Sequence, residues 1–321
     1  LRGVMPDLYT FGEAMALFLS EDTDSVIDAK LYRRSTAGAE GNVAVAVSRL
    51  GLHAHFYTHL GADELGTAIL DDFIAEGVDV SEVKRVPEFS GTMIRNPGTT
   101  RPVEATYLRK GAAATTISPT DINLGMLHSS KWVHTTGITC AISTSAASAV
   151  EFALTKAREA NIACSLDLNI RRKLWSEAQA RVVLEPLARD VDLLIGGEDE
   201  YRAIFGEKDP KRALELVSDR GCKIAIMTKG DQKIRYFING EFGEVIPPKV
   251  IAVDPVGSGD AFTGGVISGL LSGLSPIDAI KQGSVSGARV ASQFGDWAGL
   301  PTGVKGRTDP AIIAQLTGGV Q

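Results

Sequence analysis

The chain has 321 residues, of which 44% are hydrophobic and 22% are charged, and its formal net charge is -6 at pH 7. This composition is typical of a globular protein that holds one large α/β domain with a smaller appendage, or two ordinary domains. The negative charge, without a block of Lys and Arg, argues against nucleic acid as the main partner.

Three features of the sequence bear on membrane insertion and on cellular compartment. No run of about 18 apolar residues occurs, so we expect no spanning helix and no membrane partner. The first seven residues lack a basic segment followed by a long apolar core, which predicts that no signal peptide is present. Cys140, Cys164 and Cys222 are widely separated and indicate buried thiols in a reducing compartment. We therefore predict a cytoplasmic protein.

The first third of the chain alternates between strand and helix signals. Residues 8–12 predict a buried strand that ends beside Glu13. The segment 37–44 leads into a helix that stops at Gly51, and a second helix is expected over 63–76. Between these helices, residues 55–60 predict a strand.

Three histidines, His53, His55 and His59, surround that strand and fall on one side of it by alternation. This spacing suggests a metal site, but no acidic or thiol partner lies at ligand spacing nearby. We favour a solvated or helix-covered face of the strand.

The pattern changes between residues 87 and 110, where helix signals are absent. Short strand-like pieces at 91–95 and 103–109 are separated by Asn96-Pro97-Gly98. Together with the early segment, they predict a small β-sheet lid that is discontinuous in sequence, formed by about 14–36 and 88–112. Within it, alternation directs Tyr107 and Arg109 to the same face.

Regular alternation then resumes and predicts a mostly parallel central sheet flanked by helices, with right-handed crossovers. No repeat or low-complexity linker appears, so we predict a single α/β domain over 1–321. The predicted strands are 131–136, 162–168, 191–195 and 224–228, with antiparallel additions at 234–238 and 244–246 around the Asn239-Gly240 turn. The predicted helices are 143–160, 176–189, 198–205, 210–220, 258–273 and 276–293.

The segment 254–262, Asp-Pro-Val-Gly-Ser-Gly-Asp-Ala-Phe, follows an apolar run and leads into a helix. Gly257, Ser258 and Gly259 allow a tight turn whose N–H groups converge at the helix N-terminus, which predicts an anion site. Asp260 then lies in the first helical turn, where a carboxylate is favoured. A base beside a phosphate cradle is what phosphoryl transfer to a hydroxyl requires. The ordinary alternative is that this acid merely caps the helix.

Other nucleotide motifs are absent from the sequence. It contains no G-x-x-x-x-G-K-[ST] loop, and the glycine spacing does not form a dinucleotide fingerprint. Four further groups fall where open α/β sheets place ligands, at the carboxyl ends of strands. These are Asp167-Leu168-Asn169-Ile170-Arg171, the pair Tyr107 and Arg109, Gly295-Asp296-Trp297-Ala298-Gly299, and Thr228-Lys229-Gly230, which is suited to delivering backbone groups to a nucleotide.

The turn at 254–260 resembles the D-x-x-G-A-G-D signature of the ribokinase (PfkB) family of sugar kinases, with Ser258 where Ala is usual. The segment 37–44 resembles the family's G-G-x-x-x-N-x-A motif, with Ala37 in place of the first glycine. Nearly the whole chain resembles the 2-keto-3-deoxygluconate kinase branch. The motifs that carry this resemblance, in family order, are Gly12-Glu13-Ala14-Met15, Y-x-R-K-G at 107–111, Gly137-Ile138-Thr139, D-x-N-x-R with L-W at 167–175, and G-D-x-x-G at 295–299.

The resemblance implies a ribokinase-like fold and an ATP-dependent sugar-acid kinase that phosphorylates the primary hydroxyl of 2-keto-3-deoxygluconate. Asp260 is then the base, and the amides of Gly257, Ser258 and Gly259 stabilise the transferred phosphoryl group. The residues implied to bind the substrate are Gly38, Asn42, Tyr107, Arg109, Ile138, Asn169, Arg171 and Asp296. Guanidinium groups bind carboxylates bidentately, so Arg109 and Arg171 are expected to hold the acid group.

The resemblance also implies ATP and Mg²⁺ as cofactors. Thr228 and Gly230, together with Gly257 and Gly259, are expected to contact the nucleotide, and Glu200 to act indirectly on the metal. Lid sheets of this family often pair between subunits, so we expect a homo-oligomer through the lid, since an open sheet edge invites pairing.

Some positions depart from the family pattern. Met93 stands where the branch often has Tyr, Gly197 replaces the Asn of an N-x-x-E motif, and Lys233 replaces a glycine on the nucleotide side. D-x-N-x-R followed by L-W also occurs in fructokinase-like members. Three alternatives therefore stay open: a fructokinase- or ribokinase-like kinase for a neutral sugar, a non-catalytic sensor on the same fold, and, weakest, a dehydrogenase.

Overall fold

The computed structural model describes residues 5–189 and 191–301 of the chain. The chain forms two compact units, the first comprising Leu1–Tyr9 and Ile117–Pro247, and the second comprising Thr10–Thr116 and Pro248–Gln321. Residues 1–4, part of the stretch in which we expect no signal peptide, lie outside the described residues. A single domain over 1–321 stays a prediction.

The first unit is built on parallel strands in continuous, mostly buried runs, as strands covered on both faces require. Within this unit the strand order is β14-β13-β12-β11-β10-β9. The first two residues of β1 (Leu8–Phe11) also belong to it, whereas β4 (Ala54–Tyr57) belongs to the second unit. The parallel strands are β9 (Trp132–Thr136), β10 (Ala163–Asp167), β11 (Leu193–Gly197) and β12 (Ile224–Thr228).

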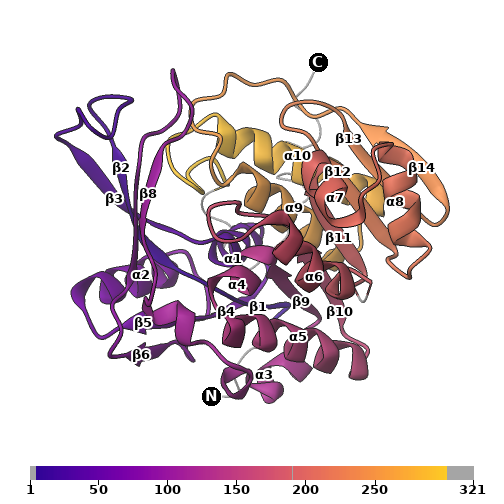
Figure 1. Ribbon diagram of the computed structural model, residues 1–321, viewed down its shortest axis with the longest axis horizontal. Coiled ribbons are helices and arrows are strands. Elements are labelled where there is room, and N and C mark those ends of the chain that lie inside the picture. Colours follow the sequence, from indigo (N-terminus) through magenta and orange to yellow (C-terminus); the bar gives the residue numbers. More distant parts are fainter. Residues whose placement is uncertain (1–4, 190, 302–321) are drawn as a thin grey trace. The chain divides into compact units, whose positions relative to one another are not determined.

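An antiparallel hairpin extends this sheet beyond β12, in orange in Figure 1. β13 (Ile234–Ile238) and β14 (Glu241–Val245) are joined by Asn239 and Gly240, whose φ angles are 52° and 84°. Two positive φ angles in a two-residue loop form the type I′ turn, which matches the twist of the strands. The predicted hairpin is confirmed.

The helices of the first unit begin at side-chain caps that the sequence supplies. Ser143 accepts the N–H of Ala146 at the start of α5, and Ser176 forms a capping box with Gln179 at the start of α6. The helices are α3 (Leu124–Ser129), α4 (Gly137–Ile142), α5 (Thr144–Glu159), α6 (Glu177–Leu187), α7 (Glu198–Phe205) and α8 (Pro210–Ser218), with a 3-10 turn, η2, at Pro119–Asp121.

The helices of the second unit pack tightly around small residues. Helices α9 (Ser258–Leu271) and α10 (Pro276–Ala291) lie against each other, and α9 also contacts α1 (Ala39–Arg49) (Figure 1). A Cβ on Gly265 would lie 2.7 Å from the Cα of Gly283, so glycine is required for the approach of α9 to α10. The remaining elements are β5 (His59–Gly61), α2 (Glu64–Ala75), β6 (Lys84–Val86) and the 3-10 turn η1 (Ala113–Thr116).

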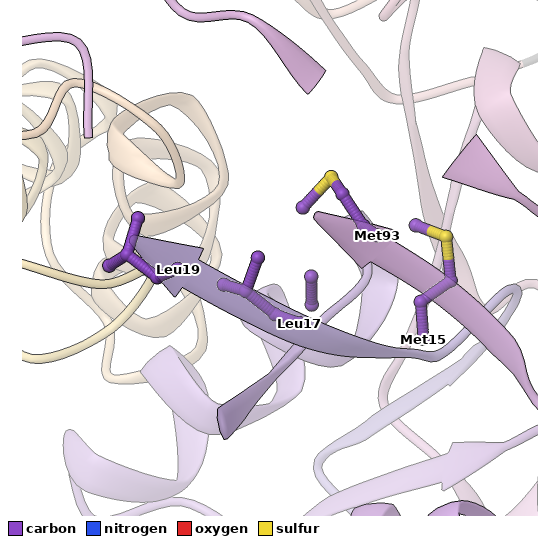
Figure 2. Packing of buried hydrophobic residues seen from close by; sticks show 5 residues of the cluster. Met15, Leu17, Leu19 and Met93 are labelled. Carbon is purple, nitrogen blue, oxygen red and sulfur yellow. The ribbon is translucent and has the colours of Figure 1, made fainter. Parts of the chain in front are cut away.

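The second unit also holds a separate four-stranded sheet in the order β3-β2-β7-β8, which we call the small sheet. Its strands are β2 (Met15–Ser20), β3 (Tyr32–Ala37), β7 (Gly91–Arg95) and β8 (Ala105–Leu108). Alternate residues of β2, Met15, Leu17 and Leu19, lie on one face with Met93 from the adjacent β7, as Figure 2 shows. This face is the apolar core of the small sheet.

The fold predicted from the sequence is confirmed as a mostly parallel sheet flanked by helices, with a separate small sheet. Two of the three histidines are buried among polar partners. His59 is bonded to Tyr57 and Thr116 at 2.6 Å each, and His55 lies 3.2 Å from the carboxylate of Asp79 and 3.5 Å from that of Glu82, which local spacing in the sequence did not indicate. In the described part of the chain, no helix is both long and apolar enough to cross a bilayer.

Candidate active site

The turn before helix α9 has the backbone geometry of an anion site. Gly257 has a φ of 81°, in the left-handed region that favours glycine, and a Cβ there would lie 2.2 Å from the carbonyl oxygen of Asp296. The helix begins at Ser258, and the N–H groups of its first turn have no partner inside the helix. Gly259 is exposed, and a Cβ on it would meet no atom within 4 Å. Apart from the N–H of Ser258, which donates to the preceding backbone, these donors are suited to bind an anion.

Ser258 stabilises the turn from within. Its hydroxyl donates to the carbonyl oxygen of Pro255 at 2.7 Å, and its N–H donates to the same oxygen at 3.3 Å. A side-chain hydroxyl that bonds the preceding backbone in this way is typical of serine in turns. The hydroxyl, which the usual alanine lacks, thus fixes the shape of the loop.

Asp260 lies in the first turn of α9 with 9% of its surface exposed. Its Oδ2 accepts a hydrogen bond from Asn42 Nδ2 at 2.7 Å, and the same Nδ2 lies 3.4 Å from Asp296 Oδ2. Asn42 comes from helix α1, so the structure brings it to two acids that follow it by 218 and 254 positions in the sequence. Asn42 therefore fixes the orientation of the Asp260 carboxylate.

Arg95, at the end of β7, joins this group through two carboxylates. It donates to Asp254 at 3.0 Å and 2.8 Å and to Asp296 at 2.7 Å. Burial raises the pKa of Asp296 against the opposing effect of Arg95. Burial also works against the charge of Arg95, but Asp296 and Asp254 hold the pKa of its guanidinium above the ordinary value.

Gly38 marks the start of α1 and makes a close backbone approach. Its φ is 151°, and a Cβ on it would lie 2.2 Å from the carbonyl oxygen of Glu13. No larger residue fits there without moving the segment after β1. Gly38, which is predicted to bind the substrate, is therefore also required by the packing of the backbone.

Arg109 is engaged by Glu13 within the second unit. Arg109 Nε donates to Glu13 Oε1 at 3.1 Å, Nη2 donates to Oε2, and the guanidinium lies 5.2 Å from the centre of the Tyr107 ring. The predicted shared face of Tyr107 and Arg109 is therefore confirmed. Burial raises the pKa of Glu13 to about 7, although Arg109 acts in the opposite direction and Glu40 adds to the rise.

In the first unit, Glu200 holds the loop that carries Asn169 and Arg171. Its Oε1 accepts the N–H of Ile170 at 2.6 Å, and its Oε2 accepts the N–H of Gly197 at 2.6 Å. Asn169 has a φ of 34°, and Arg171 is exposed. Each carboxylate oxygen of Glu200 thus accepts one backbone N–H, and its predicted indirect action on a metal stays a prediction.

The other predicted residues of the first unit lie at strand ends. Ile138 is buried in α4, and its N–H donates to Thr136 Oγ1 at 3.1 Å. Thr228 ends β12, and Gly230, with a φ of 56°, is exposed and has open space where a Cβ would be. These positions agree with delivery of backbone groups to a ligand, while their contacts with a nucleotide stay predictions.

The residues present fit a phosphate better than a protein-bound metal. The open amides at the start of α9 provide donors and a positive helix end. Mg²⁺ usually binds through substrate phosphates and water with one or two carboxylates, and the described residues hold no ready-made metal cluster. The arrangement therefore agrees with a divalent ion that is held through bound phosphates.

Sequence reasoning missed three residues of this arrangement: Glu13 as a partner of Arg109, Asp254 as a buried anchor, and Arg95 altogether. Asp254 and Glu13 stand inside the quoted motifs, so their position was a usable signal. Arg95 is the last of the five residues of β7 and carries no local mark of burial.

Comparisons with known proteins identify the family of this chain. Residues 5–303 match the pfkB family carbohydrate kinases. The chain is 32% identical over 300 residues to the 2-dehydro-3-deoxygluconokinase of Bacillus subtilis, across 92% of this chain and 93% of that protein. It is also 32% identical over 299 residues to the 2-dehydro-3-deoxygalactonokinase of Haloferax volcanii, across 91% and 93%.

A solved structure shows the same fold. The crystal structure of 2-dehydro-3-deoxygluconokinase from Thermotoga maritima superposes with a TM-score of 0.86 at 26% identity, covering 91% of this chain and 95% of that one. Because the family match spans most of its length, the chain belongs to the pfkB family of carbohydrate kinases.

Proposed function

We propose that this chain transfers the terminal phosphoryl group of ATP to the primary hydroxyl of 2-keto-3-deoxygluconate, giving 2-keto-3-deoxy-6-phosphogluconate and ADP. The observation that carries the proposal is Asp260, held by Asn42 in the first turn of α9 beside the exposed Gly259. The relatives that are 32% identical and named for keto-deoxy sugar acids support the substrate class.

The chemistry needs only positioned groups. Asp260 accepts the proton of the attacking hydroxyl, the new O–P bond forms, and the bond from the terminal phosphorus to the bridging oxygen of ADP breaks. The amides at Gly257 and Gly259 stabilise charge on the transferred group, which is the main contribution of a kinase site. Mg²⁺, when bound, neutralises phosphate charge.

Substrate recognition is assigned to arginines because the acid carries a carboxylate. Arg109 binds it after Glu13 releases the guanidinium, and the exposed Arg171 adds a second cation. Glu200 serves by holding the loop of Asn169 and Arg171. The nucleotide is assigned to Thr228 and Gly230.

A neutral sugar is the second candidate substrate, and one observation favours it. Because Glu13 already neutralises Arg109, a sugar without a carboxylate has no ion pair to break. Faster turnover of fructose or ribose than of 2-keto-3-deoxygluconate and 2-keto-3-deoxygalactonate in a coupled ADP assay would decide for this candidate.

Asp260→Asn tests the base within the same assay. We expect kcat to fall by about 10²–10⁴-fold with little change in sugar affinity. Unchanged turnover would remove Asp260 from the mechanism, and binding without turnover in the wild type would support a sensor.

The proposal also includes a cytoplasmic location and a homo-oligomer. The three buried cysteines and the absence of a spanning helix within the described residues support a cytoplasmic enzyme. Strands β3 and β8 are the edges of the small sheet, and open edges support pairing with a second copy. Size-exclusion chromatography with light scattering measures the assembly.

A further inference from the structure

Arg95 is a large charged side chain with no exposed surface, at the end of strand β7. A buried guanidinium loses its hydration, so it is kept only where carboxylates and hydrogen bonds replace the lost water. Replacing such a group with an apolar side chain of similar size is often neutral for stability. A buried arginine therefore points to a specific requirement for its charge and geometry.

The partners of Arg95 lie on both sides of the catalytic turn. Its two terminal nitrogens donate to the two oxygens of Asp254 at 3.0 Å and 2.8 Å, and Nη2 also donates to Asp296 Oδ1 at 2.7 Å. Both carboxylates are nearly inaccessible, with 0% and 4% exposure. One cation thus fixes two acids that are far apart in sequence.

Asp254 in turn accepts hydrogen bonds from two backbone N–H groups. Its Oδ1 accepts the N–H of Val256 at 3.2 Å, and its Oδ2 accepts the N–H of Gly295 at 3.1 Å. The first bond shapes the turn that leads into α9. The second holds the loop that presents Asp296.

Asp296 connects Arg95 to the turn at Gly257 and, through Asn42, to the base. Its backbone is the surface on which Gly257 packs, and its Oδ2 lies 3.4 Å from Asn42 Nδ2. Asn42 in turn donates to Asp260 at 2.7 Å. The amides of the turn and the carboxylate of the base therefore depend on the same buried cation.

We propose that Arg95 is a positioning residue for phosphoryl transfer, which fixes Asp254 and Asp296 and, through Asn42, holds Asp260 against the turn of Gly257. This inference rests on the proposed phosphoryl transfer but not on the identity of the sugar. It assigns to strand β7 a role in catalysis in addition to its predicted place in the lid.

The test compares Arg95→Met, which removes the charge, with Arg95→Lys, which keeps it but cannot bond both acids in a fork. We expect Arg95→Met to lower kcat by about 10²-fold, because small displacements of reacting groups have effects of that size. We expect Arg95→Lys to regain about tenfold of this loss, since one charge-assisted bond is recovered. The sugar KM should change much less than kcat.

The pH–rate profile distinguishes positioning from a purely structural role. Loss of the cation beside Asp254 and Asp296 should move the acid limb of kcat/KM to higher pH by about one unit. Lost packing alone lowers the amount of folded enzyme and leaves the limb in place. Arg34→Met is the matched control, because Arg34 makes the same forked pair with Asp72 at 2.7 Å on strand β3.

A second variant covers the case in which Arg95→Met does not fold. Arg95→Met with Asp254→Asn removes one positive and one negative charge, and it keeps the net charge of the cluster. We expect the same fall in kcat, because the forked contact is lost, but an acid limb near its wild-type position, because the net charge is unchanged. If the folded single or double variant keeps the wild-type kcat, the proposal is overturned.

Failure of the proposed function can be distinguished from failure of the positioning role of Arg95. All variants are assayed with whichever sugar the wild type turns over fastest, so a wrong sugar leaves this test intact. If the wild type phosphorylates none, the proposed function fails, and Arg95 is tested by carbon-13 NMR of the Asp260 carboxyl, assigned with Asp260→Asn. A titration midpoint that does not move in Arg95→Met then overturns the positioning role.

Discussion

Glu13 occupies the edge of Arg109 that is formed by Nε and Nη2, one of the edges at which a guanidinium binds a substrate carboxylate. Nε of Arg109 donates to Glu13 Oε1 at 3.1 Å, and Nη2 donates to Oε2, in the forked geometry that arginine uses for organic acids. The side chain of Glu13 is only 2% exposed. The protein therefore carries an internal carboxylate at the group predicted to bind an external one.

This pair predicts that affinity for an acid substrate depends on pH. Burial raises the pKa of Glu13 to about 7, with Glu40 of α1 adding to the rise and Arg109 opposing it. Above that pH the ionised Glu13 competes for Arg109, and below it the neutral acid competes weakly. We expect the KM for 2-keto-3-deoxygluconate to rise by about tenfold between pH 6 and pH 8, the size of one charge-assisted bond.

Glu13→Gln should abolish this rise, while Glu76→Gln, which removes a forked pair with Arg49, should keep it. Initial rates over a pH series with the acid and with fructose measure the effect. A KM that is flat with pH in the wild type, or a rise that survives in Glu13→Gln, contradicts the competition.

The same carboxyl makes a prediction about stability. Its pKa rises from 4.5 to about 7 on folding, so between these values the folded state binds more protons than the unfolded state. The free energy of unfolding therefore falls as pH rises through this window, by on the order of 3 kcal/mol, and this contribution is fully present only below the lower value.

Urea unfolding of the wild type and of Glu13→Gln from pH 4.5 to pH 8 isolates the effect. Asp296 and Glu200 also have raised pKa values through burial, but they contribute equally to both proteins. The difference between the two curves should therefore slope through the window. Parallel curves would show that Glu13 is already ionised in the folded protein.

Local patterns in the sequence predict most of the fold. The helix at 198–205 and the strands at 91–95, 224–228 and 234–238 have the predicted bounds. Caps and periodicity decide such segments, as with Asp63, whose side chain accepts the N–H of Gly66 at the start of α2. Short elements such as α3 and α4 were missed because six residues give too little periodicity.

The site was predictable only where its chemistry lies within one motif. Asp260 and Gly257 stand three positions apart, so their joint role can be read from the sequence. The network of Arg95 joins residues from four separate segments, and its burial depends on how those segments fold together. The position of Arg95 is set by the pairing of β7 with β2 and β8, which no local pattern in the sequence predicts.

The apolar face of the small sheet yields a prediction about packing. Met93 is 5% exposed and pairs across strands with Tyr107, beside Leu17 and Met15 (Figure 2). Met93→Ala should lower the free energy of unfolding by about 2–5 kcal/mol through lost burial and the cavity left behind. Met93→Leu, which conserves volume, should lower it by less than about 1.5 kcal/mol.

Denaturant unfolding with a probe in the second unit measures both variants. If Met93→Ala unfolds like the wild type, the face is covered less closely than the buried fractions indicate. A selective rise in protease cleavage of residues 15–37 would instead show that only the small sheet is destabilised.

The turn at Gly257 gives a prediction that separates steric contact from backbone strain. A Cβ there would lie 2.2 Å from the carbonyl oxygen of Asp296, whereas Gly273, with a similar φ of 82°, has no atom within 4 Å of its Cβ position. Gly273→Ala therefore reports the cost of the left-handed backbone alone, about 1 kcal/mol. Gly257→Ala adds a collision with backbone atoms that cannot rotate away.

We expect Gly257→Ala to lower kcat by more than about 10²-fold, because the amides of the turn and the neighbouring Asp296 are displaced together. Gly273→Ala should retain wild-type kcat with a small loss of stability. Steady-state kinetics and thermal unfolding of the two variants provide the comparison. Equal effects of both substitutions would mean that strain, rather than the contact with Asp296, explains the glycine, and that the turn can move away from Asp296 without loss of catalysis.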